Sequence, residues 1–156
     1  MRLRRILQRI NGEWNSIMQL DEISDIFELL GDWEQRYQYL VELGEKLPAM
    51  PEHMKTDDNR VKACMSKVWL VAYRHDGHIR FHGDCDTSVI KGVLALLINL
   101  CNDLTAKEIQ HIDMDEIFKR LSLDEHLSPN RHIGVYAMFD LMKQKAAQCE
   151  KATQAA

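Results

Sequence analysis

The feature that most constrains this chain is a predicted β-hairpin at its centre, between two long stretches with helical patterns. Residues 68–73 are rich in β-branched and aromatic side chains, which favour strands. A His-Asp-Gly turn follows at residues 75–77, and beyond it Ile79 and Phe81 alternate with polar neighbours as in a second strand. Residues 60–62 are a candidate third strand. A sheet of only two or three short strands cannot bury its hydrophobic face by itself. The flanking helices must therefore cover it.

Helical patterns precede the hairpin. Residues 21–30 carry apolar side chains at three- and four-residue steps, and Gly31 ends this predicted helix. Asp32 is a candidate N-cap for a second helix, which Pro48 stops because proline has no N–H to donate. The polar residues 49–59 are predicted to form a surface loop.

Helices return after the hairpin. Residues 87–100 are apolar on most sides, which predicts a central, buried helix. Residues 105–108 have the spacing of a capping box, Asp113 begins another short helix, and residues 128–129 (Ser-Pro) begin the last helix. That helix is expected to end near Cys149. The order of elements predicts an α+β fold in which a small antiparallel sheet of two or three strands packs against several α-helices.

The length of the chain indicates one domain. Its 156 residues, 46% of them hydrophobic, are enough for a single core of ordinary size. We divide the chain into a basic N-terminal extension at residues 1–20, one domain at residues 21–150 and a flexible tail at residues 151–156. The extension has no acidic residue before Glu13 and faintly resembles an organelle transit peptide, but a solvent-exposed extension is the preferred interpretation.

Charge and hydropathy narrow the classes of function. The formal net charge of −4 argues against a nucleic-acid-binding protein, which needs a basic surface. The most apolar run, residues 93–98, is far shorter than the roughly 20 residues that span a bilayer, so no membrane partner is expected. The N-terminus does not read as a secretory signal. We therefore expect a cytoplasmic protein whose four cysteines are reduced.

Metal binding is one candidate function. Neither a glycine-rich phosphate loop nor a Gly-x-Ser-x-Gly motif is present, which leaves the histidines and thiols as chemical groups. His75, His78, His82, Cys64 and Cys85 are side chains that zinc takes as ligands. Their spacing is poor, because His75 and His78 flank a turn and the strand alternation places His78 and His82 on a polar face. A solvated face is the preferred interpretation, and a metal- or cluster-binding scaffold is kept as the alternative function.

The cysteines differ in their surroundings. Cys101 ends an apolar helix and is expected in the core, whereas Cys149 lies in the polar last turn of the chain. Cys85 stands at a predicted helix entrance, where the helix dipole favours a thiolate, or it fills a partly buried position. Cys64 lies between a polar loop and a strand, beside three cations, Arg60, Lys62 and Lys67. Residue types alone leave Cys64 either a reactive thiol or a buried structural one.

Several segments of the chain resemble segments of a known family in the same order, and this resemblance bears on whether Cys64 is a reactive or a structural thiol. Residues 63–69 (Ala-Cys-Met-Ser-Lys-Val-Trp) resemble the Gly-Cys-x-Ser-x-Val-Trp segment around the acceptor cysteine of the SufE family, whose members assist iron–sulfur cluster assembly. Residues 33–48 are similar to the family's opening helix, residues 83–92 to its Gly-Asp-Ser-Asp helix start, and residues 126–134 to the segment before its last helix. The resemblance covers about residues 21–147 in order, so it is specific as a whole.

The resemblance implies a SufE-like fold and a sulfur-transfer accessory protein rather than an independent enzyme. Cys64 would accept sulfane sulfur from the persulfide of a SufS-type cysteine desulfurase, stimulate that enzyme and pass the sulfur to an iron–sulfur scaffold complex. Pyridoxal phosphate would belong to the desulfurase, and this chain would carry only a transient cysteine persulfide, with no metal or other cofactor. Arg131, Lys67 and Met65 are the expected partner contacts, and Met65 and Val68 are expected to form an apolar pocket that shelters the persulfide.

Four positions depart from the family pattern in the same comparison. Ala63 replaces the usual glycine, while Met65 and Lys67 replace neighbours that are commonly polar and uncharged. Cys85 stands where serine is usual and supplies a second thiol at a matched position. A Cys64–Cys85 disulfide and a relay of sulfur between the two thiols are both open, and the family pattern predicts neither.

Overall fold

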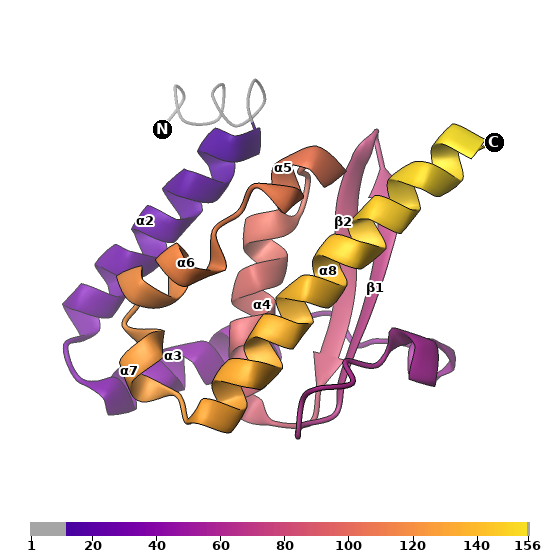
Figure 1. Ribbon diagram of the computed structural model, residues 1–156. Helices are drawn as coiled ribbons and strands as arrows, with labels where there is room; N and C mark the ends of the chain where they lie inside the picture. Colours follow the sequence, from indigo (N-terminus) through magenta and orange to yellow (C-terminus); the bar gives the residue numbers. More distant parts are fainter. Residues whose placement is uncertain (1–11, 156) are drawn as a thin grey trace.

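The hairpin lies beside several helices in the computed structural model, which describes residues 12–155 and the side chains of residues 19–152 (Figure 1). Residues 1–11 of the predicted N-terminal extension lie outside the described part of the chain. The elements in chain order are α2 (Gly12–Leu30), α3 (Trp33–Glu45), the 3-10 turns η1 (Glu52–Met54) and η2 (Asp57–Asn59), β1 (Val68–His75), β2 (His78–Cys85), α4 (Ser88–Cys101), α5 (Ala106–Gln110), α6 (Met114–Arg120), α7 (Leu123–His126) and α8 (Pro129–Ala155). This order confirms the predicted α+β fold.

The hairpin forms with the turn that the sequence predicts. Its strands pair antiparallel, from Val68 opposite Cys85 to His75 opposite His78. Asp76 and Gly77 both have positive φ, 52° and 79°, as a tight two-residue hairpin turn requires. The candidate third strand is reduced to one bridge, Arg60 opposite Trp69, so the sheet within residues 12–155 has two strands.

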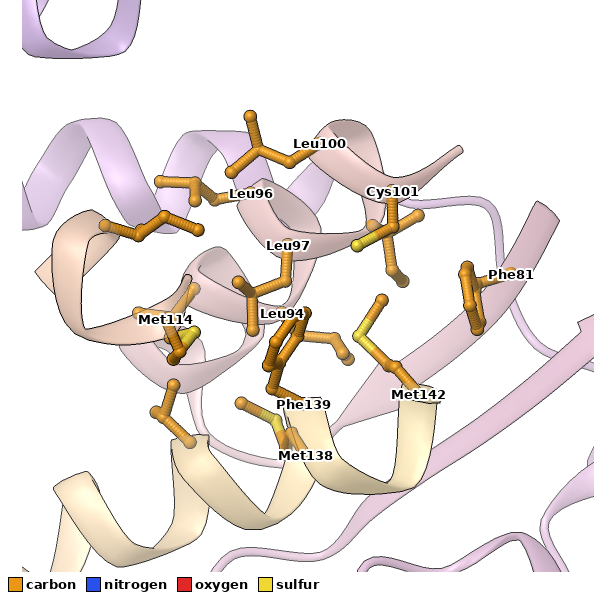
Figure 2. Close-up of a cluster of buried hydrophobic side chains, with 14 of the residues drawn as sticks. Phe81, Leu94, Leu96, Leu97, Leu100, Cys101, Met114, Met138, Phe139 and Met142 are labelled. Atoms are coloured by element: carbon orange, nitrogen blue, oxygen red, sulfur yellow. The ribbon is translucent and has the colours of Figure 1, made fainter. Parts of the chain in front are cut away.

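The core surrounds α4, as the sequence predicts for residues 87–100. Figure 2 shows Leu94 and Leu97 of α4 facing Met138 and Phe139 of α8, and all four side chains are fully buried or nearly so. Cys101 is also buried there, which confirms its predicted place in the core, and burial raises the pKa of its thiol to about 12. Although α4 is so apolar, no helix within residues 12–155 is long and apolar enough to cross a membrane.

Two glycines allow α3 to pack unusually closely on α4. A Cβ atom on Gly92 would overlap the Leu40 carbonyl, and one on Gly44 would lie 2.9 Å from the Gly92 nitrogen. The two backbones therefore approach each other at a distance that no side chain at these positions permits. This contact holds the C-terminal half of α3 against the first turns of α4.

Capping residues lie at several of the predicted helix ends, but two helix ends differ from the prediction. Asp32 accepts a hydrogen bond from the Gln35 amide (2.9 Å), which confirms it as the N-cap of α3. The first helix begins at Gly12 instead of Asp21, and α8 continues past Cys149 to Ala155. The alanine-rich end of α8 consists largely of good helix formers, which explains why the helix does not stop at the predicted position.

Candidate functional site

The Cys64 thiol rests on the backbone of α8. Cys64 lies in the irregular segment between η2 and β1 and is half-buried, while its neighbours Ala63 and Met65 are exposed. A Cβ atom built on Gly134 of α8 would lie 2.7 Å from Cys64 Sγ, closer than real contacts allow. Glycine at this position therefore makes the space in which the sulfur sits, and the thiol is partly covered by a helix.

Hydrogen bonds fix the segment on the C-terminal side of Cys64. The Lys67 amide donates to Asp86 Oδ1 (2.9 Å), and the Asp86 amide donates to the Lys67 carbonyl (3.1 Å). The hydroxyls of Ser66 and Thr87 lie 2.7 Å apart and share a hydrogen bond. The segment is thus tied to the junction between β2 and α4, which extends the hairpin pairing towards Cys64.

The N-terminal side of the segment is also anchored. The Val61 amide donates to the Val68 carbonyl (2.9 Å), and Lys62 Nζ donates to the Asp57 carbonyl (2.7 Å). Residues 63–65 therefore form a short stretch between two fixed points. Such an arrangement presents a side chain in a defined place at a low cost in ordering the backbone.

Cys85 is a buried thiol and not a helix-entrance thiolate. It is the last residue of β2, its side chain is 6% exposed on the core face, and α4 begins only at Ser88. Burial is the main cause that raises the pKa of the Cys85 thiol to about 11, and the nearby charges of Asp86, Cys64 and Asp84 add to the increase. The expectation of a thiolate favoured by a helix dipole is wrong, because desolvation outweighs the hydrogen bond that the Thr87 amide donates to Cys85 Sγ (3.5 Å).

The two thiols are neighbours without a bond between them. Their electrostatic interaction and the pairing of Val68 with Cys85 place both at the same end of the hairpin. Cys64 and Cys85 are both free thiols in the described chain. A cavity of about 190 Å³, lined by Val41, Glu45, Ser88 and Lys91 among others, lies beside Cys85.

Exposed apolar and cationic side chains border the Cys64 site. Met65 is 83% exposed and Ile133, the neighbour of Gly134, is 57% exposed. Lys67 and Arg131 are exposed as well, and Arg131 lies one helical turn before Gly134 on the same face of α8. The expected pocket of Met65 and Val68 is not present, because Met65 points to solvent and Val68 is buried in the core. Ile133 was not singled out from the sequence, although it adjoins the glycine of the matched segment.

A charged cluster supports the strands next to the site. Asp84 forms ion pairs with Lys55 (3.1 Å) and Lys91 (3.2 Å), and Lys55 Nζ lies 5.4 Å from the centre of the Trp69 ring. Burial alone would raise the pKa of Asp84, but hydrogen bonds from Lys55, the Cys85 amide and Lys91 hold its pKa below the usual value. Asp84 therefore has a structural role that links η1, β2 and α4.

The histidines of the hairpin lie on the polar face that their spacing predicts, where His78 is exposed and His82 is half-buried. The His82 ring stacks on Tyr73 with ring centres 4.9 Å apart. Ile79 and Phe81 alternate with these histidines and are buried. Among the residues with described side chains, no three His, Cys, Asp or Glu residues are grouped so that they could hold a metal ion. The alternative function as a metal- or cluster-binding scaffold has no support from these positions.

Comparisons with known proteins identify the family of the chain. A family model described as "SufE: Fe-S metabolism associated domain" matches residues 21–146. An uncharacterized SufE-like protein of Rhizobium meliloti is 39% identical over 131 residues, which are 81% of this chain and 94% of the relative. A second such protein, from Rhizobium etli, is 36% identical over 139 residues, 86% of this chain and 94% of the relative.

A solved structure shows the same fold. The solution structure of a hypothetical protein from Thermus thermophilus aligns with a TM-score of 0.70 at 18% identity, over 85% of this chain and 96% of that chain. The fold is therefore shared beyond the range of close sequence similarity. The family match and the identity to the SufE-like relatives show that the chain belongs to the SufE family and is associated with iron–sulfur metabolism.

Proposed function

We propose that this protein accepts sulfane sulfur on Cys64 from the persulfide of a SufS-type cysteine desulfurase. The observation that carries the proposal is the position of the Cys64 thiol, half-buried against Gly134 in a segment anchored at both ends. A sulfur carrier needs a thiol that a partner can reach but that bulk solvent reaches poorly, because a persulfide is readily reduced or oxidised. The membership in a family linked to Fe–S metabolism supports the same function.

The transfer is an exchange between a thiolate and a persulfide. The ionised Sγ of Cys64 attacks the outer sulfur of the partner's Cys–S–SH group along the S–S axis. A new S–S bond forms on Cys64, the old S–S bond breaks, and the desulfurase cysteine leaves as a thiolate. No electrons are gained or lost overall, so the step needs no oxidant or reductant. Pyridoxal phosphate acts only on the desulfurase, where it supplies the chemistry that removes sulfur from free cysteine.

The border of the site supports docking to a protein. Met65 and Ile133, the sequence neighbours of Cys64 and Gly134, offer exposed apolar surface, and Lys67 and Arg131 add positive charge. Exposed apolar side chains ringed by charges are typical of a protein interface. We infer that Met65 and Ile133 contact the desulfurase and that Arg131 steers its persulfide towards Cys64. An iron–sulfur scaffold complex would then take the sulfur from Cys64.

Mass spectrometry tests the proposal directly. The protein is incubated with a SufS-type desulfurase and cysteine, and the peptide that contains Cys64 is expected to gain about 32 Da, the mass of one sulfur atom. Cys64→Ser should abolish both the adduct and the stimulation of the desulfurase, while the control Cys149→Ser should keep both. If Cys64→Ser stimulates the enzyme as well as the wild type, activation by contact alone replaces sulfur acceptance as the function.

A further inference from the structure

A cavity of about 340 Å³ lies along the edge of β2 that faces away from β1. Its walls come from the end of α3, from β2, from the second half of α4 and from Tyr73 of β1, with Leu43, Leu47, Phe81 and Ile98 as apolar lining. A second cavity of about 310 Å³ adjoins it and shares Leu43, Arg80, Asn99 and Asn102 with it. The larger volume lies within the range of small-molecule sites, which are mostly apolar with a few polar groups.

The edge of β2 offers unpaired backbone groups to this cavity. In an antiparallel pair, every second residue directs its N–H and C=O away from the partner strand. Ile79 and Phe81 are such residues, because their amides donate to the Leu104 carbonyl (2.8 Å) and to Asn102 Oδ1 (3.0 Å). Gly83 follows Phe81 by two residues, so its N–H and C=O also point away from β1, and the residue lines the cavity. Neither of these two groups makes a hydrogen bond to any residue that the structure describes. A bound molecule would satisfy them.

Two cationic side chains, Arg80 and Lys46, line the cavity. Its lining in the described chain contains no acidic residue, although Asp103, the ion-pair partner of Arg80, lines the adjoining cavity. Arg80 Nε is buried and forms an ion pair with Asp103 Oδ1 (3.4 Å), but it makes no hydrogen bond to any described atom, because this contact is poorly aligned. Lys46 is exposed and forms no ion pair within the described residues. A buried donor without an acceptor is costly, which points to an anionic ligand at Arg80.

We propose that this cavity binds a small organic anion, with an apolar body against Leu43, Leu47 and Phe81 and a carboxylate or phosphate group at Arg80 and Lys46. The Gly83 backbone and the amides of Asn99 and Asn102 orient the polar part of the ligand. The site is separate from the sulfur-acceptor site, because it lies along the outer edge of β2, whereas Cys64 precedes β1 and contacts α8. It is independent of the proposed function.

Nuclear magnetic resonance of the full, ¹⁵N-labelled chain tests the site with three probes of similar shape. Benzoate and phenyl phosphate carry an anionic group on an aromatic ring, and benzyl alcohol carries the same ring without the charge. We expect at least one of the two anions to cause saturable shifts of the Arg80 Nε–H and Gly83 N–H signals, with a dissociation constant of about 1 mM or lower. Benzyl alcohol should bind at least about tenfold more weakly, since it lacks the charge-assisted hydrogen bond.

Two variants and a control complete the test. Arg80→Gln should weaken binding of the anion by about tenfold or more, and Lys46→Gln, an exposed change that leaves folding intact, by severalfold. Lys119→Gln on α6 removes one exposed positive charge outside the cavity and should bind as the wild type does. Absence of saturable shifts for both anions at about 10 mM would overturn the proposal, as would equal binding of benzyl alcohol or unchanged binding by both cavity variants. None of these probes contains sulfane sulfur, so failure here leaves the role of Cys64 untouched.

Discussion

The sulfur of Cys64 lies directly against Gly134, so that a Cβ atom at residue 134 would stand 2.7 Å from it. The two residues come from the segment before β1 and from the first turns of α8. Their contact couples the exposure of the thiol to the distance between these two elements. A partner that moves residues 63–65 away from α8 would expose the sulfur without unfolding the core.

Gly134→Ala should displace the thiol. The added methyl group cannot fit beside Cys64 Sγ, so we expect a loss of about 1–3 kcal/mol in the free energy of unfolding and a severalfold faster alkylation of Cys64 by iodoacetamide. The same change in a Cys64→Ala background should cost less, because the sulfur is gone. A double-mutant cycle by guanidinium unfolding measures the difference, expected on the order of 1 kcal/mol. A coupling of zero would contradict the contact.

The cysteines should differ in reactivity at neutral pH. Cys64 is half-buried at the surface, whereas Cys85 and Cys101 are buried and burial raises the pKa of their thiols to about 11 and about 12. Alkylation followed by peptide mass spectrometry should modify Cys64 first, and Cys85 and Cys101 only when the protein unfolds. With the desulfurase and cysteine but no scaffold complex, the added sulfur should remain on Cys64. A sulfur adduct that moves to Cys85 at pH 7 would instead support a relay between the two thiols.

The buried thiol of Cys85 should lower the free energy of unfolding of the protein at alkaline pH. Its thiol has a pKa of about 11 in the folded chain against 9.0 as the reference value, so the unfolded chain loses this proton first as the pH rises. The free energy of unfolding should therefore fall between pH 9 and 11, by on the order of 2 kcal/mol from this group. Cys85→Ser removes the titration and should become more stable relative to the wild type over this range. Guanidinium unfolding of both proteins at several pH values measures it, and parallel stability curves would refute the assignment.

Asp86 should hold the Cys64 segment in place. Asp86→Ala removes the acceptor of the Lys67 amide, so we expect a loss of about 1–2 kcal/mol in the free energy of unfolding. Hydrogen exchange at the Lys67 amide should become faster, because that amide loses its partner. Asp124→Ala, which removes an exposed carboxylate on α7, is the matched control and should leave this exchange rate unchanged.

Ile133 and Met65 should contribute to docking and not to folding. Changing either to serine removes exposed apolar surface, so the concentration that gives half-maximal stimulation of the desulfurase should rise severalfold. The free energy of unfolding should change by less than about 0.5 kcal/mol, as is usual for surface positions. Leu29→Ser, at a side chain on α2 that is 87% exposed, should alter neither quantity. If all three variants stimulate the desulfurase equally, Ile133 and Met65 do not belong to the interface.

Features of the fold that depend only on residues close together along the chain could be predicted from the sequence. The hairpin turn follows from Gly77 and the preceding Asp76, and the buried face of β2 follows from the alternation of Ile79 and Phe81. The capping box at Thr105 is also present, with both of its hydrogen bonds at 3.1 Å. The predicted end of the last helix was wrong, because a polar, alanine-rich segment suits a helix as well as a tail.

The amino-acid sequence alone predicts the α+β order of elements, the buried central helix and Cys64 as the candidate acceptor. The hydrophobic period, the turn residues and the matched motifs that carry these predictions all lie close together, or in a fixed order, along the chain. The states of Cys64 and Cys85, which residue types left open, required the tertiary structure. The burial of Cys85, the outward direction of Met65 and the contact between Cys64 and Gly134 arise where distant segments pack together. Desolvation depends on every atom that surrounds a group in the folded state, and no spacing along the chain contains that information.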